Sequence, residues 1–168
     1  SSEADATRGT TQSAFIEAID LVPTFVEFAG GKVQTERIEG RSLLPLLRGK
    51  SVTWREVAIS EIDYSDHGVR HILGIDPYDC RAYMIRDDQY KLVYDELYRS
   101  QLFDMKNDPD ELVDLGEHPD YANVREKLSQ ELFRWVRNLK HRTEIPYETT
   151  LKMGPDLDES LGIIIGRW

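Results

Sequence analysis

Cysteine is almost absent from this sequence, since Cys80 is the single cysteine in 168 residues. A disulfide within the chain and a cysteine-rich zinc site are therefore excluded, while the cellular compartment is left open. Long apolar runs are also missing, because stretches such as Ile163 to Ile165 fall far short of the roughly 20 residues that cross a bilayer. The sequence predicts no transmembrane helix.

Basic residues are scarce relative to acidic ones. The chain has 21 lysines and arginines against 31 aspartates and glutamates, which gives a formal charge of −10 and a pI near 4.9. Such a surface opposes binding to phosphate backbones and to anionic lipid. We therefore expect no nucleic-acid partner and no membrane partner. The hydrophobic content of 40% suits a folded domain with a core of its own.

The features of a secretory signal are missing from the first ten residues. They have no basic start followed by an apolar stretch, and the first residue is Ser1 rather than methionine. We expect a chain that begins within a longer protein, with residues 1–12 as a disordered segment or linker.

Common catalytic motifs are missing too. No glycine-rich phosphate loop, no Gly-x-Ser-x-Gly elbow and no His-Glu-x-x-His helix occurs. The nearest approach to a metal site is Asp66-His67, with Glu61 and Asp63 upstream, because carboxylate and imidazole groups are common ligands. The alternative is a solvated loop. It is favoured because no second ligand cluster accompanies these residues.

Cys80 could act as a nucleophile only with help from its neighbours. Arg81 would lower the pKa of the thiol, but no base or oxyanion-binding group accompanies it, so a structural role is favoured. The remaining histidines are interpreted as surface or capping residues: His71, His118 and His141. One arginine series could bind an anion, but acidic residues interrupt it and a mixed surface is the simpler interpretation: Arg41, Arg48 and Arg55.

Short elements are predicted in the first third of the chain. Residues 13–19 are mostly apolar and are interpreted as a strand. A helix is predicted over Asp20–Ala29, with the aspartate as N-cap and Pro23 in the first turn. A second short helix is predicted over Ser42–Gly49, with the serine as cap and the glycine as terminator.

Alternating apolar residues then predict an antiparallel sheet with short turns. Its expected strands are Arg55–Glu61, Ala82–Arg86, Tyr90–Tyr94 and Gln101–Phe103. A long amphipathic helix opens at Pro119 and carries one apolar stripe, formed by Val124, Leu128, Leu132, Trp135, Val136 and Leu139. The predicted fold class is α+β, a small antiparallel sheet of about four strands packed against a long C-terminal helix.

Several segments, taken in order, resemble the C-terminal part of type I sulfatases of the alkaline phosphatase superfamily. They are Ile19–Thr24, Ile38–Leu47, Tyr90–Val93, Leu102–Asp104 and Asn107–Glu111. Further segments resemble the phosphonate monoester hydrolase and arylsulfatase branch: Glu61–Tyr64, Cys80–Ile85 and Gly162–Gly166. The resemblance covers the chain from about Ser13 to its end.

The resemblance implies that a full-length parent hydrolyses sulfuric, phosphonate or phosphate esters. In that family a cysteine within Cys-x-Pro-Ser-Arg becomes formylglycine, whose hydrate attacks sulfur or phosphorus beside a divalent cation. In the family those motifs precede the Asp-Leu-x-Pro-Thr segment. In this chain Asp66-His67-Gly68 follows that segment, so it does not correspond to the metal motif. Cys80 begins Cys80-Arg81-Ala82, which does not match the nucleophile motif. No catalytic, cofactor-binding or metal residue of the family maps onto this chain. We therefore expect an architectural fragment without a cofactor of its own.

The resemblance also implies a domain organisation. Residues 13–50 would pack on a missing N-terminal α/β domain, residues 51–140 would form the sheet and helix, and residues 141–168 an extended tail. The apolar end of that tail, Leu161–Trp168, needs a cover. A neighbouring subunit is the favoured cover, with docking onto its own chain as the alternative. The expected partners are thus the missing domain and further copies of the chain.

Two other classes remain open. A stand-alone protein-binding module would show a contiguous exposed apolar patch on a stable monomer. A degenerate homologue of natural short length would have its native start immediately before Ser1. An upstream reading frame with Cys-x-Pro-Ser-Arg followed by Asp-His-Gly would instead identify a hydrolase. The present chain does not distinguish sulfate from phosphonate or phosphodiester substrates.

Overall fold

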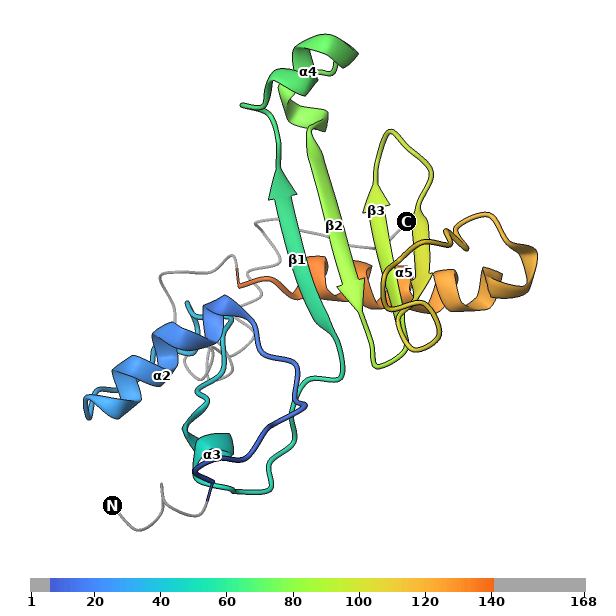
Figure 1. Cartoon of the computed structure of the whole chain (residues 1–168). Coiled ribbons are helices and arrows are strands. Elements are labelled where there is room, and N and C mark those ends of the chain that lie inside the picture. The colour runs from blue at the N-terminus through green and yellow to red at the C-terminus, as the bar shows by residue number, and fades with distance from the viewer. Residues whose placement is uncertain (1–6, 141–168) are drawn as a thin grey trace, which may run out of the picture.

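The core of the molecule is a four-stranded antiparallel sheet with one long helix across one face. A computed structural model describes residues 7–140. The strand order is β1-β2-β3-β4, so each strand pairs with the next along the chain (Figure 1). The strands are β1 (Ala58–Asp63), β2 (Arg81–Arg86), β3 (Tyr90–Asp95) and β4 (Gln101–Asp104). The helices are α2 (Leu21–Phe28), α3 (Leu44–Leu47), α4 (Gly68–Leu73) and α5 (Ala122–Asn138), with short 3-10 turns η1 (Ala18–Asp20), η2 (Pro77–Asp79) and η3 (Pro119–Tyr121).

One row of apolar residues crosses the whole sheet. Ile59 pairs with Ile85, Ile85 with Leu92, and Leu92 with Leu102. Because neighbours in register point to the same face, this row forms one continuous apolar strip. Buried residues from α5, Leu128 and Leu132, complete the cluster with the three buried members of the row. The predicted α+β fold class is confirmed.

The sheet was predicted closely except at its first strand. The second, third and fourth predicted strands lie within a residue of β2, β3 and β4. The prediction of Arg55–Glu61 was wrong at its start, because β1 begins at Ala58 and continues to Asp63. Arg55 stands outside the ladder because its guanidinium bonds the buried Asp20.

The N-terminal segment differs from its prediction in several respects. The predicted strand over residues 13–19 was wrong, since these residues pair with no strand among residues 7–140 and Ala18 and Ile19 belong to η1. The Phe15 carbonyl oxygen accepts from Trp54 Nε1 over 2.7 Å. Asp20 precedes α2 as predicted, but its carboxylate bonds no N–H group in the first turn of α2. It accepts the Glu17 N–H in a capping box at η1, and it accepts further bonds from distant segments. The prediction of Ser42 as the cap of the second helix was wrong by one residue, because the N-cap of α3 is Leu43; the Ser42 hydroxyl nevertheless accepts from the Leu44 N–H at 3.3 Å.

The connection from β1 to β2 was not anticipated by the sequence pattern. It contains α4 and η2, which lie beyond the end of the sheet and away from α2 and α5 (Figure 1). The long helix was anticipated, although its first turn is η3 and Val136 at the edge of the stripe is exposed.

Two predictions about membranes and the tail have different outcomes. Over residues 7–140 no helix combines the length and apolar character that a bilayer crossing demands. The tail, residues 141–168, and its apolar end lie outside the described residues, so the tail stays a prediction.

Candidate functional site

A buried carboxylate, Asp20, joins several distant segments. Its side chain is fully buried and accepts hydrogen bonds from Arg55 Nη1 at 2.5 Å and Arg55 Nη2 at 2.6 Å. The backbone N–H groups of Arg41 and Glu17 donate to the same carboxylate over 2.8 and 2.9 Å. Four donors of this kind satisfy a buried carboxylate that would otherwise be costly.

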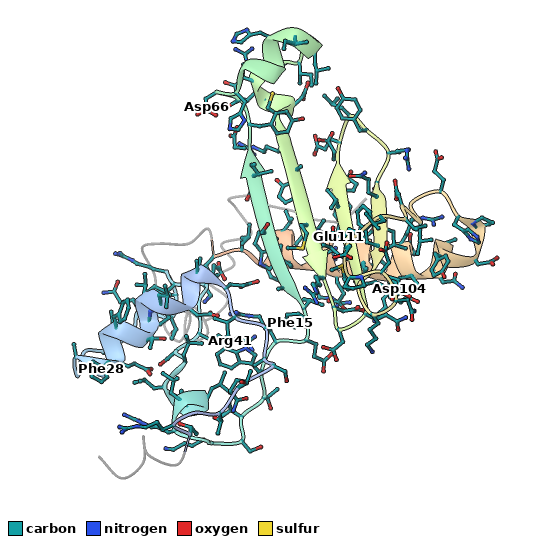
Figure 2. The ribbon with its side chains drawn as sticks, viewed as in Figure 1. Phe15, Phe28, Arg41, Asp66, Asp104 and Glu111 are labelled. Carbon is teal, nitrogen blue, oxygen red and sulfur yellow. The ribbon has the colours of Figure 1, made fainter. Side chains whose placement is uncertain are left out.

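Neighbouring residues extend this arrangement to the loop before α3. The Thr24 hydroxyl donates to the Asp20 carbonyl oxygen at 2.6 Å and accepts from the Leu43 N–H at 2.8 Å. A Cβ added at Gly40 would lie 2.1 Å from the Ile19 carbonyl oxygen, so only glycine fits this close approach. We call these residues, with Arg55, the Asp20 network. It holds α2 against the loop that carries Arg41 (Figure 2).

The Asp20 network also reaches the sheet. Glu17 accepts from the Ile59 N–H at 2.8 Å and lies 3.3 Å from Arg55 Nη1. The first strand is therefore tied to the segment before α2 by one side chain. This places the short helices at a fixed position relative to the sheet.

The protonation states of the central pair follow from these contacts. Burial by itself raises the pKa of Asp20, but hydrogen bonds from Arg55 and from backbone N–H groups outweigh it and hold the pKa below its ordinary value. Burial acts to lower the pKa of Arg55, and the carboxylates of Asp20 and Glu17 raise it overall. Both members of the pair are therefore charged at neutral pH.

A second buried carboxylate, Asp104, organises the loop after β4. It accepts from the Lys106 and Asn107 backbone N–H groups, both at 3.1 Å, and from Asn107 Nδ2 at 2.8 Å. Gln89 Nε2 donates to it over 3.1 Å from the β2–β3 turn. Burial raises the pKa of Asp104, but these bonds lower it further than burial raises it. Asp104 thus acts as a structural anchor.

The Asp66-His67 pair lies in the opposite part of the molecule. Asp66 stands near α4, far from Arg41 and Asp104 (Figure 2). Both side chains are exposed, and His67 Nε2 is 3.9 Å from Asp66 Oδ1. Within residues 7–140 no three histidine, cysteine or acidic side chains converge as metal ligands would. The Asp63 carboxylate accepts a hydrogen bond from the Ser65 N–H at 2.9 Å and forms an ion pair with Arg81 Nε at 3.9 Å.

Cys80 has the surroundings of a structural cysteine. It is fully buried, and its Sγ donates to the Asp76 carbonyl oxygen at 3.3 Å. Burial raises the pKa of the thiol, and Arg70 opposes this only partly. A protonated, inaccessible thiol is a poor nucleophile.

The histidines and arginines have separate roles. His118 Nδ1 accepts from the Asp120 N–H at 3.3 Å and so caps η3, as predicted. His71 is exposed on α4, and His141 lies outside the described residues. The interpretation of Arg55 as part of a mixed surface was wrong, because it is buried against Asp20. No local sequence pattern predicts the pairing of Arg55 with Asp20, since the two residues are separated by 35 positions.

A groove of about 860 Å³ lies beside the Asp20 network. It runs between α5, the β2–β3 turn, and the residues around Phe15 and Trp54. Charges of both signs line it, and Lys127 Nζ pairs with Asp87 Oδ2 across it at 3.2 Å. Neither histidine nor cysteine is among the described lining residues.

Comparison with known proteins identifies the family of this chain. A family model described as N-sulphoglucosamine sulphohydrolase, C-terminal, matches residues 3–138. The chain belongs to this family. The resemblance inferred from the sequence motifs, to sulfatases and phosphonate monoester hydrolases of the alkaline phosphatase superfamily, is confirmed.

The curated relatives that this chain matches are much longer than the chain itself. An ulvan-active sulfatase of Formosa agariphila is 31% identical, over 77% of this chain and 30% of its own length. The multifunctional alkaline phosphatase superfamily protein PehA of Trinickia caryophylli is 32% identical, over 84% of this chain and 28% of its own length. The chain thus spans less than a third of these proteins.

A solved structure agrees with the fold. The phosphonate monoester hydrolase of Agrobacterium radiobacter superimposes with a TM-score of 0.70 at 28% identity, over 77% of this chain and 26% of that protein. The segments that carried the resemblance are the segments that the buried carboxylates join: Asp20 and Thr24 bond the Arg41 and Leu43 N–H groups, and Asp104 bonds Asn107. In this member of the family those motifs hold the fold together.

Proposed function

We propose that this chain is the non-catalytic C-terminal part of a sulfatase-like ester hydrolase. The observation that carries the proposal is the use made of its family motifs. Asp20, Thr24 and Asp104 are buried and fully engaged in structural hydrogen bonds. A hydrolase that activates its nucleophile with a metal needs several ligands that converge on one point. The exposed pair Asp66 and His67 supplies two groups only, 3.9 Å apart.

The chemistry of the parent would come from residues that precede this chain. Formylglycine and a divalent cation are the groups that the family resemblance implies. The described residues do not fit such an ion, because no three candidate ligands gather in residues 7–140. We therefore assign neither group to this chain. The proposed substrates of the parent are sulfuric esters or phosphonate and phosphate esters, since both kinds of hydrolase occur among the relatives.

Helix α2 supplies the surface that the preceding part would cover. Phe25 is 64% exposed and Phe28 is 78% exposed, and Leu21 and Val22 beside them are also exposed. Pro23 and Thr24, on the other side, are buried against the chain itself. A helix that is apolar on both sides is typical of one buried on several sides. We commit to the α/β part of the same protein as its occupant, because the relatives are three to four times as long as the matched segment.

Enzyme assays on the chain test the proposal. Purified chain should hydrolyse aryl sulfates and phosphonate monoesters no faster than a protein-free control, with or without Mn²⁺ or Ca²⁺. The His67→Ala chain is the matched variant and should give the same result. Metal-dependent turnover that disappears in His67→Ala would overturn the proposal and assign a metal site to Asp66 and His67.

The reading frame upstream of Ser1 provides an independent test. A Cys-x-Pro-Ser-Arg motif followed by Asp-His-Gly would support a catalytic parent. A native start codon immediately before Ser1 would contradict it and favour a degenerate homologue.

A further inference from the structure

The two edges of the sheet differ, because one is covered and the other is open. Along β4, the Leu115 N–H donates to the Leu102 carbonyl oxygen at 2.7 Å, and the Leu102 N–H donates to Asp114 Oδ1 at 3.1 Å. The backbone groups that Leu102 turns outwards are therefore occupied. At the other edge, no strand among residues 7–140 pairs with β1 apart from β2. An open strand edge can accept a further strand.

The backbone groups of β1 alternate between β2 and the open edge. The Tyr64 N–H, just after β1, continues the ladder by donating to the Cys80 carbonyl oxygen at 2.9 Å. The Ile59 N–H points the other way and donates to Glu17 Oε1 over 2.8 Å. Glu61 lies two residues after Ile59 and has the same orientation, so its N–H and C=O groups face the open edge. Within residues 7–140 no strand pairs with them.

The side chains along this edge are exposed and acidic. Ile62 is 52% exposed although it is a large apolar residue within a strand. Glu61 and Asp63 on either side of it are also exposed. In the described part of the chain only Asp63 of these two has a cationic partner, Arg81 at 3.9 Å. A strand that joins this edge should therefore be apolar and carry no negative charge.

The chain leaves the described residues on the same side of the sheet. Lys140 Nζ lies 3.8 Å from Glu39 Oε2. The adjacent Gly40 lies against Ile19, and Glu17 of that segment bonds β1. Figure 1 accordingly shows the C-terminal end of α5 beyond β1, on the side of α2. The segment that follows Lys140 is thus connected to the molecule beside the open edge rather than beside β4.

We propose that the last segment, Leu161–Trp168, adds to the open edge of β1 in its own chain as a fifth strand. Its three consecutive isoleucines are β-branched residues of the kind that favour strands. The segment contains Arg167 and no acidic residue, so it suits the acidic edge. A second copy of β1 does not, because like charges would lie opposite one another. The pairing is independent of the proposed function, which concerns catalysis and α2.

The connection to Lys140 favours the chain's own segment over that of a neighbouring subunit, which the sequence alone favoured. Residues 141–160 join Lys140 to the segment. A flexible linker of this length spans about 25 Å on average. Such a linker gives the segment an effective concentration on the order of millimolar at its own edge. A neighbour's segment competes only at a comparable protein concentration.

Amide hydrogen exchange tests the pairing in the full chain. The Glu61 N–H should exchange about tenfold or more slowly than in a chain that lacks Leu161–Trp168, because only the full chain supplies its acceptor. The Ile62 N–H faces β2 and should be equally protected in both chains, which verifies that the sheet remains folded.

Substitutions within the segment separate strand pairing from mere apolar contact. Ile163→Pro with Ile164→Pro should act like the deletion, because proline has no N–H and consecutive residues alternate, so one of the two faces β1 in either register. Ile163→Val with Ile164→Val is the matched control and should act like the unaltered chain, since valine is also β-branched.

A labelling experiment distinguishes the chain's own segment from a neighbour's. An isotope-labelled chain without Leu161–Trp168 is mixed with an equal amount of unlabelled full chain, at a concentration at which the full chain protects Glu61. The labelled Glu61 N–H should still exchange fast. The proposal is overturned if that N–H becomes protected in the mixture, if it exchanges equally fast in the full and shortened chains, or if the proline variant keeps the protection.

Discussion

At the scale of single residues, the molecule depends on a buried ion pair in which each charge is well satisfied. Asp20 receives two bonds from Arg55 and two from backbone N–H groups. Removing one member of such a pair leaves the other charge buried without compensation, which costs more than the pair contributes. The pair therefore stabilises the contact between the first helices and the sheet only when both charged side chains are present.

Substitution of Asp20 should show this cost. Asp20→Asn keeps the shape of the side chain and should lower the free energy of unfolding by about 3 kcal/mol or more, because Arg55 loses its main partner. Chemical denaturation at pH 7 measures the change. Asp66→Asn is the matched control and should change stability by less than about 0.5 kcal/mol, because that residue is exposed. Equal effects of the two substitutions would contradict the buried role of Asp20.

The same measurement has a defined pH dependence. The pKa of Asp20 is lowered in the folded chain, so its ionised form stabilises the fold above the unfolded pKa of about 3.9. That stabilisation is lost as the pH falls through the folded pKa. The difference between the unaltered chain and Asp20→Asn should therefore shrink when both are titrated below about pH 4.

At the scale of elements, α5 and the sheet depend on one another. Leu128 and Leu132 lie one helical turn apart on the buried face of α5, against Ile85, Leu92 and Leu102. The sheet would otherwise expose the apolar row that its register creates. Helix and sheet are thus a single cooperative unit, in which the apolar burial of each requires the other.

Truncation of Leu132 should destabilise this unit strongly. Leu132→Ala removes a buried side chain from the middle of the stripe and should cost about 2 to 5 kcal/mol. Phe133→Ala is the control on the same helix, since Phe133 is exposed, and should cost far less. Thermal and urea unfolding give both values. A loss below about 1 kcal/mol for Leu132→Ala would place the buried face elsewhere.

At the scale of the whole molecule, the structure presents apolar surface that its own core does not cover. Helix α2 lies to one side of the sheet and exposes Phe28 at its outer end (Figure 2). The longer relatives contain two thirds or more of their length outside the matched segment. Because the relatives have this additional length, we link the exposed helix to a missing partner within the same protein.

Exposure of α2 should be detectable in solution. The chain should bind a hydrophobic dye and associate in light scattering, because Phe25 and Phe28 remain in contact with water. Phe25→Ser with Phe28→Ser should reduce dye binding substantially without loss of the circular dichroism signal. A strictly monomeric chain that binds no dye would refute an interdomain role for this helix.

Local patterns predicted the elements whose partners are neighbours in the chain. Strands β2, β3 and β4 follow from alternating residues joined by short turns, and α5 follows from the spacing of Leu128 and Leu132. Residues 64–80 were missed because α4 is short and has neither a side-chain N-cap bond nor a sustained apolar period. Asp20 was assigned a local capping role because capping is what an aspartate before a helix most often does.

The sequence by itself determined the α+β class, the order of the strands, the long helix and, through ordered motifs, the sulfatase family. Periodicity and turn chemistry act over a few residues, so these features can be read along the chain. Only the tertiary structure decided that Asp20 binds Arg55 and that Gly40 lies against Ile19. Such contacts join positions that are distant in sequence, and their energy exists only once folding has excluded water and brought the partners together.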